Sequence, residues 1–177
     1  FGYVVTSPYG DGGQTDVDAQ RVLDSGGEPL GGYAALLGGA TPWAAPRAHD
    51  YLLGKLRSMP HVVTDSACSA TSINAGIKSY NAAINVDPRG TQVEPIARVL
   101  QKRGWKIGVV TSVPISHATP AAAYANNVSR NDYQDLTRDL IGLPSVAHRT
   151  GPLPGVDVLL GCGWGLLLGR RVLVAGL

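Results

Sequence analysis

Cysteine, phenylalanine and methionine are all scarce in this chain of 177 residues, which has two Cys, one Phe and one Met. Two cysteines, Cys68 and Cys162, cannot staple a disulfide-rich fold, and they do not identify the redox compartment. The formal charge is only +2, from 15 Lys and Arg against 13 Asp and Glu. So small an excess argues against nucleic acid or an anionic membrane surface as a partner.

Long hydrophobic runs are also missing. The most apolar stretch, residues 156–168, contains Asp157 and is soon followed by Arg170 and Arg171. A spanning helix needs about 18 uncharged residues, so we expect no membrane span, and no signal peptide is visible. The apolar, strand-like residues 172–177 would leave a sticky edge in a finished domain. We therefore expect one incomplete domain, residues 1–177, from a longer protein.

What the chain does have is enough apolar residues for a core, at 44%, and alternating strand and helix patterns. A capping box at Thr91 and Glu94 predicts the clearest helix, ended by Gly104. The alternation predicts an α/β fold with a mostly parallel sheet, in which ligands bind beyond the carboxyl ends of the strands. The predicted strands are 1–7, 61–64, 106–111 and 156–160, and the predicted helices are 16–23, 49–58, 66–82, 91–104, one opened by Thr119-Pro120, and 132–141.

The end of the predicted strand 61–64 carries the most informative residues, Thr-Asp-Ser-Ala-Cys-Ser-Ala-Thr at 64–71. A serine where a strand turns into a helix points its hydroxyl out of the sheet, and the helix N-terminus favours negative charge beside it. Ser66 is thus suited to attack phosphorus. The alternative is that Ser66 only caps the helix, which is the commonest job of a serine in such a place.

This segment resembles the alkaline phosphatase signature around the nucleophilic serine, in residues 64–67, 69–71 and 76–81. The resemblance implies a three-layer α/β/α sandwich and a covalent phosphoserine at Ser66. It also implies that Asp65 orients the arginine that clamps phosphate. Arg130, in Asn-Asn-Val-Ser-Arg-Asn-Asp-Tyr at 126–133, matches that arginine. Without the family, Arg130 would be interpreted as a solvated surface charge.

Further matches concern metal sites. Thr119, within residues 114–122, matches the family's hydroxyl ligand of magnesium, and its alternative role is a helix cap. His117 stands where the family carries Asp or His beside the metals; the alternative is a structural role, which an isolated histidine has more often than a ligand role. Residues 10–14 match more weakly the family's Asp-Gly-Met-Gly, with the methionine missing. Asp11 is then the carboxylate bridging zinc and magnesium, or else a turn residue that caps backbone amides.

The resemblance therefore implies a phosphomonoester hydrolase with two zinc ions and one magnesium ion, held in part by Asp11, Ser66 and Thr119. The family's other ligands have no match in these residues, so we expect the 177 residues alone to be inactive. The alternatives are a phosphodiesterase or sulfatase of the same superfamily, or a non-catalytic, truncated phosphate-binding scaffold. Small phosphate monoesters are the expected partners, a homodimer is open, and the family implies a periplasmic or secreted location.

Overall fold

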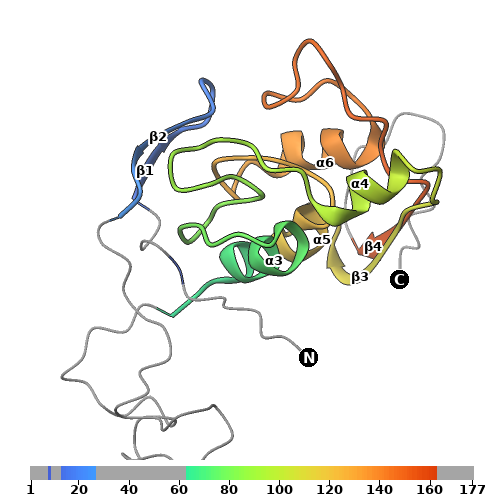
Figure 1. The fold of residues 1–177 in the computed structure, drawn as a ribbon, viewed down its shortest axis with the longest axis horizontal. Helices are drawn as coiled ribbons and strands as arrows, with labels where there is room; N and C mark the ends of the chain where they lie inside the picture. The colour runs from blue at the N-terminus through green and yellow to red at the C-terminus, as the bar shows by residue number, and fades with distance from the viewer. Residues whose placement is uncertain (1–7, 9–12, 27–62, 163–177) are drawn as a thin grey trace, which may run out of the picture.

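The computed structural model describes residues 8, 13–26 and 63–162. The predicted strand 1–7 and helix 49–58 lie outside these residues, as does the first half of the strand predicted at 61–64, whose Val63 and Thr64 belong to no strand. Figure 1 shows the arrangement of the described elements. In chain order they are β1 (Gln14–Asp16), β2 (Arg21–Asp24), α3 (Ser66–Ala75), α4 (Ile96–Gln101), β3 (Gly108–Pro114), α5 (Ala118–Ala122), α6 (Tyr133–Ile141) and β4 (Val158–Cys162).

The strands β3 and β4 pair in parallel, with α5 and α6 in the crossover between them. The register joins Val109 to Leu159 and shifts before Pro114. Each strand begins two residues later than predicted, because the Asp157 carboxylate accepts the backbone N–H of Ile107 at 3.0 Å and fixes the entry into both strands. The α/β class with a parallel sheet is confirmed; the three-layer sandwich stays a prediction.

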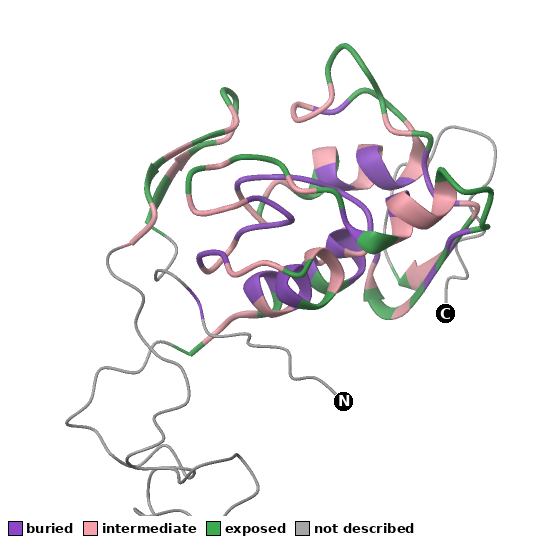
Figure 2. Cartoon of the chain, in the orientation of Figure 1, coloured by how far each residue is buried: buried purple, intermediate pink, exposed green. Residues whose placement is uncertain are grey.

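Small side chains let α3 and α5 approach closely, as Figure 1 shows. Between them lies a core cluster in which alanine predominates, and alanine needs no space beyond its own methyl group. Figure 2 shows buried stretches in each of α3, α5 and α6. The buried members of the cluster are Ala67, Ala70, Ile84, Ala118, Ala121, Ala122, Ala125 and Leu136. This packing fixes the position of the start of α3.

The helix predicted at 16–23 is wrong, because the structure has the antiparallel hairpin of β1 and β2 there. The Asp16 carboxylate accepts the backbone N–H of Ala19 at 3.0 Å, which closes a turn in place of a helical ladder. Gln20 then takes a left-handed backbone conformation, with φ of 51°. Local side-chain-to-backbone bonds thus outweigh the helical propensity of the segment.

The capping box predicted at Thr91 and Glu94 is also wrong, since α4 begins only after Pro95. A proline disfavours the α conformation of the residue before it, so Glu94 cannot belong to the helix. Its carboxylate instead forms an ion pair with Lys102 at 2.6 Å. Thr91 donates its backbone N–H to Asp87 Oδ1 at 2.8 Å.

Three other helix predictions have different outcomes. The helix predicted at 66–82 ends at Ala75, because Gly76 adopts φ of 69° and closes the C-terminus. The helix predicted to open at Thr119-Pro120 has His117 as its N-cap, so Thr119 lies inside α5. The helix predicted at 132–141 is confirmed as α6, with Asp132 as its N-cap. Among the described residues, no helix is long and apolar enough to cross a membrane.

Candidate active site

Ser66 is the first residue of α3, and its hydroxyl does not cap that helix. The cap is Asp65, whose Oδ1 accepts the backbone N–H of Cys68 at 2.8 Å. Ser66 is exposed, so its Oγ stands free of the capping role at the positive end of the helix dipole. The alternative interpretation of Ser66 as the N-cap is therefore wrong, because the preceding aspartate takes that position.

The neighbouring thiol of Cys68 is a poor competitor as a nucleophile. Cys68 is fully buried, and its Sγ lies 3.2 Å from the backbone oxygen of Ser79. Burial raises the pKa of the Cys68 thiol, so the reactive thiolate is disfavoured. Ser66, by contrast, presents an accessible hydroxyl at the start of α3.

Arg130 meets Ser66 and Asp65 from a segment more than 60 residues away. Its Nη1 donates to Ser66 Oγ at 2.7 Å and to Asp65 Oδ2 at 3.0 Å. Only about a quarter of each charged side chain is exposed, 26% for Arg130 and 24% for Asp65. Arg130 is therefore not the solvated surface charge of the alternative interpretation. The ion pair holds a guanidinium over the serine hydroxyl, where a planar fork of donors suits phosphate oxygens.

This ion pair is held in place by two residues to which the sequence analysis assigned no role. The backbone N–H of Ala82 donates to Asp65 Oδ2 at 3.0 Å, and the Ala82 carbonyl accepts the backbone N–H of Arg130 at 2.8 Å. Asn81 accepts the backbone N–H of Asp65 on its Oδ1 at 2.9 Å. Ala82 has φ of 78°, which an alanine seldom adopts. Asn81 lay inside the matched motif, whereas no sequence signal marks Ala82.

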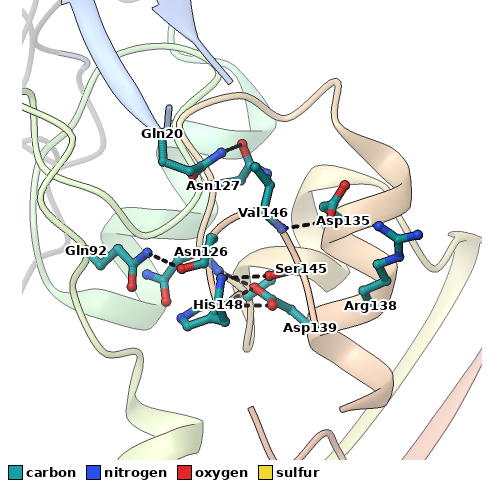
Figure 3. Close-up of polar contacts among 12 residues, drawn as sticks. Gln20, Gln92, Asn126, Asn127, Asp135, Arg138, Asp139, Ser145, Val146 and His148 are labelled. Atoms are coloured by element: carbon teal, nitrogen blue, oxygen red, sulfur yellow. Dashed lines mark hydrogen bonds and ion pairs between the residues drawn. The ribbon is translucent and has the colours of Figure 1, made fainter. Parts of the chain in front are cut away.

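The segment that carries Arg130 is fixed by Asn127. The Asn127 Oδ1 accepts the backbone N–H of Ser129 at 3.0 Å, and its Nδ2 donates to Asp132 Oδ2 at 2.8 Å. Burial raises the pKa of the Asp132 carboxyl, which sits at the start of α6. In Figure 3, Asn127 lies beside Gln20 of the hairpin, another residue that the sequence analysis missed.

Of the predicted metal residues other than Ser66, the structure describes Thr119 and His117. Thr119 is exposed and lines a pocket together with Asn74 and the start of β3, and neither Ser66 nor Arg130 lines it. His117 packs its ring against Tyr133, with ring centroids 5.9 Å apart. Asp11 lies outside the described residues. Within residues 13–26 and 63–162, no group of three or more His, Cys, Asp or Glu could hold a metal ion.

Comparison with known proteins gives one consistent family. Residues 10–170 match the alkaline phosphatase family. The chain is 36% identical over 124 residues to alkaline phosphatase 3 of Bacillus subtilis (strain 168), covering 67% of this chain and 26% of that protein. It is 35% identical over 125 residues to the alkaline phosphatase of Escherichia coli (strain K12), covering 70% of this chain and 26% of that protein.

Among solved structures, the chain resembles the cold-active alkaline phosphatase of Shewanella sp. at 37% identity and a TM-score of 0.48, over 58% of this chain and 23% of that one. The chain spans about a quarter of the length of the curated relatives just described. The family match extends over nearly all of this chain, and it includes the segments that bring Asp65, Ser66 and Arg130 together. The chain therefore belongs to the alkaline phosphatase family.

Proposed function

We propose that the protein carrying this chain hydrolyses phosphate monoesters through a phosphoserine formed at Ser66. The observation that carries the proposal is the 2.7 Å contact between Arg130 Nη1 and Ser66 Oγ. A phosphoryl group bonded to that oxygen would lie within reach of the guanidinium. Arg130 would then bind two of its non-bridging oxygens with charge-assisted hydrogen bonds.

The chemistry consists of two displacements at phosphorus. In the first, Ser66 Oγ bonds to phosphorus while the bond to the alcohol oxygen breaks, and the Ser66 proton passes to solvent as the alcohol leaves protonated. In the second, water bonds to phosphorus, the Ser66 Oγ–phosphorus bond breaks, and Ser66 regains a proton as inorganic phosphate leaves. The positive end of α3 and the Arg130 guanidinium both stabilise negative charge that develops on the oxygens.

Asp65 has a supporting role in this proposal. Its carboxylate accepts from Arg130, from the backbone of Ala82 and from the helix start, so it holds the guanidinium on one side and α3 on the other. A guanidinium held in advance loses little conformational entropy when phosphate binds. The arginine also favours a monoester over a diester, because a monoester offers more charged, non-bridging oxygens to its donors.

Metal ions belong to the proposal through the family, with two zinc ions and one magnesium ion as expected cofactors. They would neutralise phosphate charge and make a serine oxygen a better nucleophile. The described residues do not fit such a site by themselves, because Ser66 and Thr119 offer only single hydroxyl oxygens and no group of three or more His, Cys, Asp or Glu that could hold a metal ion lies among the described residues. A catalytic zinc needs about three protein ligands. The steps above therefore rest on the chain's own residues.

The family resemblance also carries our proposals that the protein is periplasmic or secreted and that it can form a homodimer. No described residue favours a phosphodiesterase, a sulfatase or a non-catalytic scaffold over the monoesterase. Those alternatives become outcomes of the experiment below, which uses the complete protein.

The first test traps the phosphoserine. The complete protein is incubated with radiolabelled inorganic phosphate at acidic pH, and the label is located by peptide mass spectrometry. We expect label on Ser66, none in Ser66→Ala protein, and full labelling in Ser69→Ala protein, which lacks a different serine of α3. Equal labelling of the Ser66→Ala variant would refute the assignment. No labelling at all, with sulfate-ester or diester turnover, would favour the superfamily alternatives.

The second test removes the arginine. Arg130→Ala should lower kcat/KM for a chromogenic phosphate monoester by about ten- to a hundredfold, the loss expected for hydrogen bonds to a charged group. Inhibition by inorganic phosphate should weaken by a similar factor. Arg138→Ala is the matched control, because Arg138 also forms an ion pair, with Asp135 at 3.2 Å, but contacts neither Ser66 nor Asp65. Equal effects of the two variants would remove Arg130 from the site.

A further inference from the structure

The segment that carries Arg130, residues 126–132, is held on one side by the stretch that follows α3. Asn127 and Ile84 exchange two backbone hydrogen bonds, of 2.9 and 3.0 Å. The Arg130 N–H donates to the Ala82 carbonyl at 2.8 Å. These bonds fix the backbone of the segment, but they leave the Asn127 carboxamide to be oriented by other groups.

On its other side the segment is hydrogen-bonded to the β1–β2 hairpin by the side chain of Gln20. The Gln20 Nε2 donates to Asn127 Oδ1 at 3.2 Å, and the Gln20 Oε1 accepts the backbone N–H of Val128 at 3.2 Å. Gln20 Nε2 also donates to the Val17 carbonyl at 2.8 Å, which ties the side chain to its own turn. Figure 3 shows the Gln20 side chain reaching Asn127. The glutamine thus contacts two consecutive residues of the segment.

The backbone conformation of Gln20 is unfavourable for a residue with a side chain, which indicates that the glutamine side chain has a role at this position. Gln20 has φ of 51°, a left-handed conformation that glycine adopts more easily. The side chain is fully used, since both its oxygen and its nitrogen are bonded to other residues. A hydrophobic contact supports the same interface, because Val17 and Val22 pack against the cluster of Tyr80, Ala83, Val86 and Val128.

The effect of Gln20 reaches Arg130 through Asn127. A carboxamide has one oxygen and one nitrogen, so the Gln20 donor selects the orientation in which Asn127 Oδ1 also accepts from Ser129 and Nδ2 donates to Asp132. Those two partners flank Arg130 in the sequence. If Asn127 turned over, its NH2 group would face the Ser129 N–H, and the bend that presents Arg130 would lose a bond on each side.

We propose that Gln20 is a positioning residue for Arg130, and that the hairpin thereby sets how tightly the phosphoryl group is bound. The inference rests on the proposed function of Arg130 as the phosphate clamp. Gln20 touches neither Ser66 nor the place of the phosphoryl group. It acts by keeping the segment 126–132 in the one arrangement that brings the guanidinium to Ser66 Oγ.

A double-mutant cycle on the complete protein tests the proposal. The inhibition constant of inorganic phosphate and the kcat and KM for 4-nitrophenyl phosphate are measured for wild type, Gln20→Ala, Arg130→Ala and the double variant. Gln20→Ala should raise the phosphate inhibition constant roughly three- to thirtyfold, as expected for coupled neighbours. In the Arg130→Ala background, Gln20→Ala should change it less than about twofold, because the group through which Gln20 acts is gone.

Two further variants separate positioning from a general effect on the fold. Gln92→Ala is the matched control, since Gln92 also bonds one backbone oxygen, that of Ala147 at 3.0 Å, and should leave the phosphate inhibition constant unchanged. Gln20→Glu keeps the size of the side chain and its acceptor for Val128, but places an oxygen against Asn127 Oδ1. It should weaken phosphate binding as Gln20→Ala does, with the thermal midpoint of each variant measured alongside.

The possible failures are distinguishable. If Gln20→Ala weakens phosphate binding by the same factor with and without Arg130, or lowers only the thermal midpoint, Gln20 is merely structural and the inference is overturned. If Arg130→Ala weakens phosphate binding and neither Gln20 variant does, the inference also fails while the proposed function stands. If Arg130→Ala itself leaves phosphate binding unchanged, the proposed function fails first.

Discussion

Asp65→Asn is the substitution whose consequence can be worked out most fully, because both oxygens of that carboxylate accept hydrogen bonds from identified donors. Oδ1 accepts the N–H of Cys68 at 2.8 Å, and Oδ2 accepts the N–H of Ala82 and the Nη1 of Arg130, each at 3.0 Å. An asparagine has a single acceptor oxygen and an NH2 group. In either orientation, its NH2 group faces at least one donor.

The size of the loss in stability depends on which donors the single side-chain oxygen of the asparagine still faces. With the oxygen toward Ala82 and Arg130, the helix loses its cap, which costs about 1 kcal/mol. With the oxygen toward Cys68, two bonds are lost, one of them to a charged partner, at about 1–3 kcal/mol in all. Solvent screens the ion pair, since a quarter of each side chain is exposed. We therefore expect Asp65→Asn to lower the free energy of unfolding by about 1–2 kcal/mol, and Asp65→Ala, which loses every contact, by about 2–4 kcal/mol.

Urea unfolding of the complete protein, monitored by a signal from the domain that contains α3, measures the loss of stability in Asp65→Asn and in Asp65→Ala. Asp24→Asn is the control, because Asp24 is exposed and accepts only from the nearby Gly26 N–H, at 2.9 Å, among the contacts described. It should change stability by less than about 0.5 kcal/mol. In Arg130→Ala protein, the cost of Asp65→Asn should shrink, because one of the three donors is gone. An Asp65→Asn variant as stable as wild type would refute the three-donor arrangement.

Three other variants test the structure around the site. Ala82→Gly should stabilise the protein by about 0.5–1 kcal/mol in urea unfolding, since at φ of 78° the relief of alanine strain exceeds the entropy that glycine adds to the unfolded chain; a destabilised variant would contradict this. His148→Ala should lower the free energy of unfolding, measured by thermal unfolding, by about 2–4 kcal/mol. The reason is that the fully buried Asp139 carboxylate loses the His148 Nδ1 partner 3.0 Å away and keeps only the Asn126 N–H among the contacts described. A change near zero would mean that water replaces the histidine. Burial raises the pKa of the Asp132 carboxyl, so the folded protein binds this proton more tightly than the unfolded chain does. The protonated carboxyl therefore contributes to stability at low pH, and that contribution is lost as the pH rises past the ordinary value of 3.8. Asp132→Asn should therefore gain stability relative to wild type as the pH rises through that range, and a constant difference between the two unfolding curves would be the contrary result.

The features that the sequence predicted correctly are those with local causes. The confirmed helix α6 has an aspartate cap at Asp132 and a glycine at its C-terminus, both visible in the sequence. Runs of β-branched and apolar residues marked β3 and β4, and an α/β alternation implied that they would be parallel. Ser66 was recognisable because the motif around it is contiguous.

The failed predictions have causes that a sequence pattern does not take into account. Residues 16–23 carry a helical pattern of acidic and apolar residues, yet the Asp16 side chain closes a turn and the segment pairs with itself as a hairpin. Thr91 and Glu94 have the spacing of a capping box, yet Pro95 excludes Glu94 from the helix. In both places a side-chain bond or a steric rule acting on one residue overrides the average preference of the segment.

The arrangement of Arg130 is the part of the site that the sequence could least determine. Ala82, in an unusual backbone conformation, ties residue 65 to residue 130 through one N–H and one carbonyl, beside the contact of the guanidinium with Ser66. Such a tie joins three segments distant in the sequence, and no periodicity or propensity encodes it. The motif therefore marked the residues that we propose do the chemistry, whereas their arrangement in space depends on packing between segments that carry no motif. If Gln20 positions Arg130 as we propose, we expect a family member with the same serine, aspartate and arginine but a different hairpin to bind phosphate with a different affinity.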